Sequence, residues 1–275
     1  MPIPVLFLTL FAALLHASWN TLLRGGADRL WSMTIMCVAI ALTCLLVAVF
    51  VPPPQLASWK YALLSALLHV GYNLCLVRSY RSGDLGQTYP IARGTSPLLV
   101  TCAAALFAGE RISAGTLCGI TLICTGILLL GVRRGKVAFS GLRYPLATGA
   151  FIAAYSVVDG IGVRLSGHAV AYTVWMSALW ALMMPAIYLV LRDSKSLFCR
   201  RPGWQMAAAG GLISLLAYGM IIYAMTLAPL GAVSALRETS VLFAAVLGAL
   251  FLGETLTLRK IIACAVIAAG TFITG

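Results

Sequence analysis

The chain has 275 residues, of which 61% are hydrophobic and only 9% are charged. About a quarter of the residues of a water-soluble domain are normally charged, so this composition excludes an ordinary soluble protein. The net charge of +12 could indicate nucleic-acid binding, but no connection between apolar segments is long enough to fold as a separate domain, so we expect no soluble catalytic or nucleic-acid-binding domain.

Ten apolar runs along the chain are each long enough to cross a hydrocarbon core of roughly 30 Å as a helix. Their predicted limits are 4–22, 31–51, 59–78, 86–108, 115–132, 144–164, 170–191, 205–228, 232–252 and 258–274. The first run lacks a basic segment in front of it and contains His16, Trp19 and Asn20, so it differs from a secretory signal peptide. We therefore predict an all-α membrane protein with ten transmembrane helices joined by short loops.

Basic residues are distributed unevenly over the connections between these runs. The odd-numbered connections contain fourteen of the 19 basic residues, whereas the even-numbered ones contain only Lys60, Arg111 and Arg164. The positive-inside rule therefore places the odd connections in the cytoplasm. This topology predicts a multi-pass membrane protein with both termini outside the cytoplasm. The two remaining basic residues, Arg93 and Arg237, lie inside apolar runs and need another explanation.

The cysteines do not form a metal-binding or redox motif. All eight lie outside any CxxC pattern, and none has a histidine at the spacing of metal ligands. Seven lie within apolar runs, where cysteine behaves as a small apolar residue. The sequence therefore predicts neither a metal site nor a cofactor.

The second half of the chain repeats the first half at an offset of 144 residues. The segment ARGTSPLL at 92–99 corresponds to LRETSVLF at 236–243, and ALFAGE at 105–110 corresponds to ALFLGE at 249–254. We assign residues 1–135 to repeat 1 and residues 136–275 to repeat 2. Because each repeat has an odd number of helices, five, the second must enter the membrane from the opposite side. Inverted repeats are typical of secondary transporters with a substrate site near the bilayer midplane.

With these features the chain resembles the EamA branch of the drug/metabolite transporter (DMT) superfamily. The resemblance rests on the ten spans, the two five-helix repeats, the small-residue-rich fifth and tenth runs, and the blocks ALFAGERIS and ALFLGETLT that end the fourth and ninth runs. It covers essentially the whole chain. The resemblance implies a transporter, most often an inner-membrane exporter of amino acids, their derivatives or other metabolites and drugs, but it does not identify the cargo.

Four charged residues lie within the predicted spans: Arg93, Asp159, Arg237 and Glu238. Charge at the centre of a membrane helix is costly, so we expect all four to face the interior of the bundle. The predicted topology puts Arg93 in the cytoplasmic third of its helix and Arg237 in the outer third of its own, one near each mouth of a central cavity. Either guanidinium could bind a carboxylate or phosphate, or could form a structural ion pair.

Other polar and aromatic residues could line the same cavity. His16 and Asn20 lie one turn apart in the first run, and His69, Tyr72 and Asn73 share a helical face in the third. The histidines could bind substrate, relay a proton or hydrogen-bond between helices. Aromatic residues of the sixth to eighth runs could complete the lining, although packing is their more common role: Tyr155, Tyr172, Trp175, Trp180 and Tyr218. The predicted substrate-binding residues are His16, Asn20, His69, Tyr72, Asn73, Tyr89, Arg93, Tyr155, Asp159, Trp175, Tyr218, Arg237 and Glu238.

These residues favour a secondary transporter that exports a small amino-acid-like or carboxylate-bearing metabolite by alternating access, for example an opine or a metal-chelating conjugate. Asp159, Glu238 or a histidine could carry a counter-moving proton. No ATP-binding or hydrolytic motif is present, so we expect no enzyme activity. A sugar-phosphate or nucleotide-sugar transporter and a non-transporting membrane subunit remain alternatives.

Two further expectations concern helix ends and small residues. Glu110 and Glu254 are predicted to cap helices or to anchor loops. Gly115, Gly119 and Gly126 could pack within the fold or between copies, so both a monomer and a homodimer are open.

Overall fold

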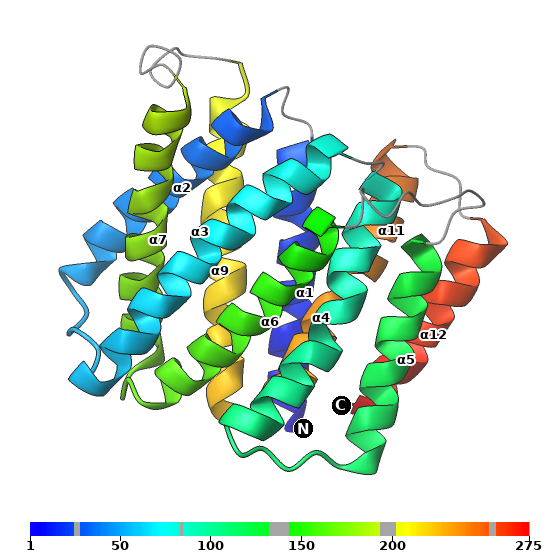
Figure 1. Ribbon diagram of the computed structural model, residues 1–275. Coiled ribbons are helices and arrows are strands. Elements are labelled where there is room, and N and C mark those ends of the chain that lie inside the picture. The colour runs from blue at the N-terminus through cyan, green and yellow to red at the C-terminus, as the bar shows by residue number, and fades with distance from the viewer. Residues whose placement is uncertain (25–27, 83–84, 132–142, 193–201, 253–256, 275) are drawn as a thin grey trace.

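The computed structural model is a bundle of α-helices (Figure 1). It describes residues 1–24, 28–82, 85–131, 143–192, 202–252 and 257–274, and these residues contain no β-strand. In a lipid environment a helix satisfies every backbone polar group within its own segment, which is why the apolar runs take this form. The predicted boundary between the repeats, at residues 135 and 136, lies outside the described residues.

Each of the ten apolar runs is helical in the structure. The helices of the first half are α1 (Ile3–Arg24), α2 (Arg29–Ala48), α3 (Trp59–Ser82), α4 (Leu85–Phe107) and α5 (Ala114–Gly131), with a short 3-10 helix η1 (Leu56–Ser58) before α3. Those of the second half are α6 (Arg143–Arg164), α7 (Ala169–Leu191), α9 (Trp204–Leu227), α10 (Leu230–Glu238), α11 (Ser240–Leu252) and α12 (Leu258–Thr274).

The ninth run is divided into two helices, so the prediction of one continuous helix there is wrong. The backbone leaves regular helical geometry at Thr239, where ψ is −11°. The N–H and the hydroxyl of Thr239 both donate to the carbonyl oxygen of Leu236, at 3.1 and 2.6 Å, which tightens the turn. The break directly follows Arg237 and Glu238, and thus lies beside the charged residues of this segment.

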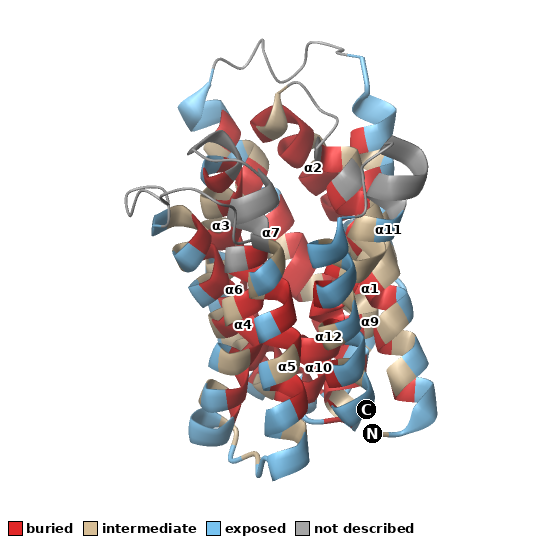
Figure 2. Ribbon diagram, turned by 90° about the vertical axis from the view of Figure 1, so that its right-hand side faces the viewer, coloured by how far each residue is buried: buried red, intermediate tan, exposed pale blue. Residues whose placement is uncertain are grey.

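Six of the described helices are long and apolar enough to cross a membrane, and 92–107 and 114–130 form shorter apolar helices. The remaining helices α10, α11 and α12 have 9, 13 and 17 residues, so length alone does not identify them as spans. Large hydrophobic side chains are exposed on the outside of the bundle, whereas His69, Arg93, Asp159, Arg237 and Glu238 are buried (Figure 2). This inside-out distribution is that of a multi-pass membrane protein.

Consecutive long helices alternate in direction, so α6 runs opposite to α1, and the two termini lie at the same end of the bundle (Figure 1). The first helices of the two halves are therefore antiparallel, as the repeat predicts. Which end faces the periplasm stays a prediction.

Helices α5 and α12 are the corresponding fifth helices of the two halves, and they pack at very short distance. A Cβ atom at Gly119 would lie 2.2 Å from Thr274 Oγ1 and 2.8 Å from the carbonyl oxygen of Gly270. A Cβ atom at Gly126 would lie 2.6 Å from a side-chain carbon of Ile267. Two of the three glycines named above therefore pack within the fold, against α12 of the same chain. At Gly115, the third of these glycines, a Cβ atom would meet nothing closer than Ser113 Oγ at 3.9 Å.

Replacing Gly119 with alanine is expected to lower the free energy of unfolding by about 1–3 kcal/mol, because the new methyl group would force α5 and α12 apart. Thermal unfolding of the purified protein in detergent measures the effect. Gly115→Ala is the matched control on the same helix, where alanine meets nothing closer than Ser113 Oγ at 3.9 Å and no loss is expected. Equal unfolding temperatures for the two variants would contradict close packing of these helices.

Candidate functional site

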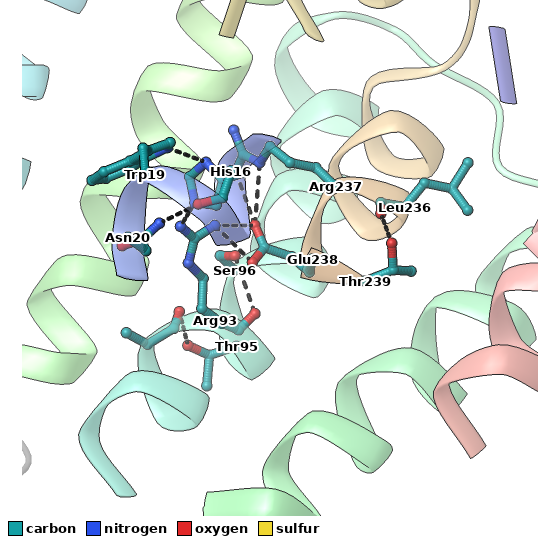
Figure 3. Close-up of polar contacts among 11 residues, drawn as sticks. His16, Trp19, Asn20, Arg93, Thr95, Ser96, Leu236, Arg237, Glu238 and Thr239 are labelled. Carbon is teal, nitrogen blue, oxygen red and sulfur yellow. Dashed lines mark hydrogen bonds and ion pairs between the residues drawn. The ribbon is translucent and has the colours of Figure 1, made fainter. Parts of the chain in front are cut away.

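Arg93, Arg237 and Glu238 form a buried ion cluster (Figure 3). Arg93 Nη1 donates to both carboxylate oxygens of Glu238, at 2.9 and 3.0 Å. Arg237 donates to Glu238 Oε1 through Nε and Nη2, at 3.2 and 3.1 Å. The three residues are at most 2% exposed, and they join α4 of the first half to α10 of the second.

This cluster corrects the expectation of one arginine near each mouth of a cavity. Glu110, in the connection after α4, hydrogen-bonds the backbone of Leu230, the first residue of α10, so α4 ends where α10 begins and the two helices are antiparallel. Arg93 is the ninth residue of α4, and Arg237 is the eighth residue of α10. Both guanidinium groups reach the same carboxylate, that of Glu238.

The cluster contains two guanidinium groups and one carboxylate, so it carries one surplus positive charge. Arg237 lies in the last turn of α10, where the helix dipole favours a cation. Its guanidinium carbon is also 5.9 Å from the centre of the Tyr155 ring, within cation–π range. These contacts stabilise the charge only in part, and the surplus makes the surroundings favourable for an anion.

His16 of α1 lies between the ion cluster and the neighbouring chamber. Its Nε2 faces Arg93 Nη2, and its Nδ1 faces Trp19 Nε1 at 3.1 Å (Figure 3). A neutral imidazole has one acceptor nitrogen and a protonated one has none. His16 can therefore accept a hydrogen bond from Arg93 or from Trp19, but not from both at once. Asn20, one turn later, donates to the carbonyl oxygen of His16 at 2.8 Å.

A chamber of about 50 Å³ lies beside this histidine. Its polar and aromatic lining comes from both halves of the chain and comprises His16, Trp19, His69, Tyr72, Asn73, Tyr155, Ser177, Trp180, Ser214 and Tyr218. The chamber therefore lies where the two halves of the chain meet.

His69 is the centre of the aromatic wall of this chamber. Its ring stacks on Tyr155 with the ring centres 4.0 Å apart and on Trp180 with the centres 5.6 Å apart, and the ring of Tyr218 meets it edge-on at 5.3 Å. Its Nδ1 lies 3.0 Å from the carbonyl oxygen of Ser65, an acceptor, so the Nδ1 hydrogen points into α3. Stacking and this bond hold the imidazole in one orientation.

Asp159 lies deeper, behind Tyr218, and is fully buried. Its two carboxylate oxygens accept hydrogen bonds from Tyr172 at 2.9 Å and from Tyr218 at 2.6 Å. In the described part of the chain it forms no ion pair, so Glu238 rather than Asp159 is the carboxylate partner of Arg237. Tyr218 thus connects a carboxylate without a cationic partner to the chamber.

Glu110 anchors this architecture from the periphery. Its carboxylate accepts a hydrogen bond from the backbone N–H of Leu230 and pairs with Arg164 Nη2 at 2.8 Å. Arg164 also donates to the carbonyl oxygens of Met225 and Ala228. The prediction of a cap or loop anchor is confirmed for Glu110, whereas Glu254 lies outside the described residues.

The structure brings most of the predicted site residues together, with two exceptions. Trp175 is outside the chamber lining and packs against Trp59, with the ring centres 5.5 Å apart. The side chain of Tyr89 lies outside the described residues. Conversely, Trp180 lines the chamber but was left out of the predicted binding set. Trp180 lies three residues after Ser177, which also lines the chamber, so the two share a helical face. This spacing is the sequence signal that could have identified Trp180 as a lining residue.

Comparison with known proteins identifies the family of this chain. A model of the EamA-like transporter family matches residues 3–132 and again residues 140–275. No curated protein matches the chain. A solved structure titled only "Crystal structure of protein" is similar with a TM-score of 0.77 and 15% sequence identity, over 98% of this chain and 94% of that chain, which shows a shared fold. Because the family model matches both halves and nearly every residue, the chain belongs to the EamA-like transporter family.

Proposed function

We propose that this membrane protein is a secondary transporter of the bacterial inner membrane that exports a small amino-acid-like or carboxylate-bearing metabolite by alternating access. Membership of a transporter family supports the class of function. The observation that carries the proposal is the surplus positive charge of the Arg93, Arg237 and Glu238 cluster beside a chamber that both halves of the chain line. In the proposed orientation both termini are periplasmic.

Alternating access is supported by the composition of the chamber wall. His16 and His69 come from the first half of the chain, whereas Tyr155 and Tyr218 come from the second. Rocking of one half against the other would therefore widen the chamber toward one end and then toward the other, as in other transporters with inverted repeats.

The charge of the site favours a carboxylate over a phosphate. Glu238 neutralises one of the two guanidiniums, so one positive charge remains for the substrate. A single carboxylate matches this surplus, whereas a phosphate ester carries up to two negative charges at neutral pH. For this reason the carboxylate-bearing class is our proposal rather than the sugar-phosphate class.

The proposal is tested by profiling the growth medium of bacteria that express the protein, without preselecting a compound. We expect one or more carboxylate-bearing compounds to accumulate outside relative to cells that express an Arg93→Gln variant. Counterflow in proteoliposomes should then show uptake of the compound but not of its amide, which lacks the negative charge. Accumulation only of compounds without a carboxylate, or of no compound, would contradict the proposal.

We propose that Asp159 binds the proton that moves in the direction opposite to the substrate. Of the four acids that the structure describes, Asp28, Glu110 and Glu238 are ion-paired, whereas Asp159 forms no ion pair and is held by neutral hydroxyl groups, among them those of Tyr172 and Tyr218. A buried carboxylate without a cation is costly when ionised, so proton uptake is less unfavourable here than at Glu238. Its link to the chamber through Tyr218 would couple that proton to the substrate.

Replacing Asp159 with asparagine is expected to leave counterflow intact but to abolish the response of net transport to an imposed pH gradient. Proteoliposomes loaded with the exported compound, with and without the gradient, measure this directly. Asp28→Asn is the control, since it removes an acid but keeps a side chain that can cap α2. If the Asp159 variant responded to the gradient as the wild type does, the proton would have to bind elsewhere.

A further inference from the structure

Two hydrogen-bond donors in the chamber wall have no acceptor. They are Nδ2 of Asn73 on α3 and Nε1 of Trp180 on α7, and within the described residues neither atom has a hydrogen-bond partner. The side chains are 4% and 8% exposed, so the donors are shielded from bulk solvent. Buried polar groups are usually hydrogen-bonded, and a specific exception requires an explanation.

The two donors lie on one wall of the chamber. His69 precedes Asn73 by one helical turn on α3, and its ring stacks on the Trp180 ring with the centres 5.6 Å apart. Packing of the imidazole between Tyr155 and Trp180 holds the indole in place. Both residues line the chamber, and both donors require an acceptor atom.

The arginines are poorly placed to supply these contacts. Arg93 bonds both oxygens of Glu238 and faces His16, and Arg237 directs Nε and Nη2 to the same carboxylate. The arginines therefore act on the chamber through their nearby positive charge rather than through hydrogen bonds. The directional contacts to a bound molecule must come from other donors.

We infer that Asn73 and Trp180 form the acceptor subsite of the chamber and donate to the oxygens of the substrate carboxylate. This inference rests on the proposed function and names the residues that contact its substrate. The division of roles suits a transporter: the buried ion cluster compensates the charge of the anion, while two neutral donors orient it. Hydrogen bonds from neutral donors are weaker than those from a guanidinium, so the carboxylate can leave when the chamber opens.

Formate is a suitable probe of the subsite, because it is the smallest carboxylate. In the purified protein labelled with ¹⁵N, the indole N–H resonance of Trp180 is expected to move downfield as formate is added. Formamide has a similar size but no charge, and should cause a much smaller shift. The Trp175→Phe and Trp180→Phe variants assign the two resonances. A Trp180 resonance that is unaffected by formate would overturn the subsite.

The same pair of variants provides a matched test in transport. Both tryptophans lie on α7, and both have a buried indole nitrogen without a partner among the described residues, but only Trp180 lines the chamber. Phenylalanine keeps a ring and removes the N–H. For counterflow of the exported carboxylate we expect Trp180→Phe to raise KM about fivefold to tenfold with little change in maximal rate, as for the loss of one hydrogen bond. Trp175→Phe should stay within about twofold.

Asn73→Asp provides a second variant of nearly the same shape, in which the donor becomes an acceptor. It should abolish binding of the carboxylate, because like charges would meet in the subsite. Equal KM values for both tryptophan variants and the wild type would overturn the subsite while leaving the proposed function intact. Conversely, a Trp180 resonance that responds to formate in a protein that exports no carboxylate would support the subsite and overturn the proposed function.

Discussion

Replacing Glu238 with glutamine is expected to destabilise the protein by about 3 kcal/mol or more, the range seen when one partner of a buried ion pair is removed. Glutamine has nearly the same shape, so the loss comes from charge: Arg93 and Arg237 would be buried side by side without a carboxylate between them. Thermal unfolding in detergent and the yield of monodisperse protein measure the effect.

A second substitution separates the charge effect from a general loss of packing. In the double variant Arg237→Gln, Glu238→Gln one of the two stranded guanidiniums is gone, so we expect part of the lost stability to return. Glu110→Gln removes a carboxylate whose partner Arg164 has a side chain that is 34% exposed, and its cost should be smaller. If the Glu238 variant unfolded at the temperature of the wild type, the ion cluster would not be a determinant of stability.

Replacing Arg93 with glutamine is expected to impair transport rather than stability, unlike the Glu238 variant. The amount of folded protein should be nearly normal, and export should fall at least tenfold. Glu238 would keep Arg237 as its partner, so no buried charge is left unpaired. The cluster would, however, become electrically neutral and would no longer favour a carboxylate in the adjacent chamber. Abundance in the membrane and export into the medium, measured on the same cultures, separate the two effects.

Each outcome assigns a role to Arg93. Loss of the protein from the membrane would show that the arginine is structural, and normal export would show that its charge is dispensable. Arg111→Gln is the matched control, since this arginine lies exposed in the connection between α4 and α5. Loss of export in the control as well would indicate a general effect of positive charge on insertion or topology.

The sequence alone predicted much of the helical architecture for a simple physical reason. A segment that lies in lipid must be apolar and must satisfy its own backbone, so long apolar runs correspond to helices. The internal repeat also identified Arg93 and Arg237 as a related pair before any contact was known. What the repeat could not provide was their shared partner, since Glu238 is 145 residues from Arg93 and has no acidic counterpart at position 94.

In a membrane helix, the periodicity of apolar residues is a poor guide to which face is buried. Lipid-facing and core-facing positions are both apolar, so the pattern along α7 does not distinguish the side that carries Trp175 from the side that carries Trp180. The packing of α7 against its neighbours decided that Trp180 faces the chamber and that Trp175 packs on Trp59.

The amino-acid sequence by itself determined the class of the protein, the limits of most helices, the duplication and the set of polar residues that must avoid lipid. Only the tertiary structure decided which of those polar residues meet, because contacts between antiparallel helices depend on their relative level and rotation. The ion cluster joins α4 to α10 through one carboxylate, and the break at Thr239 follows directly after it. The cluster arises from the packing of one half of the chain against the other, whereas the bonds at the break are local, from Thr239 to Leu236.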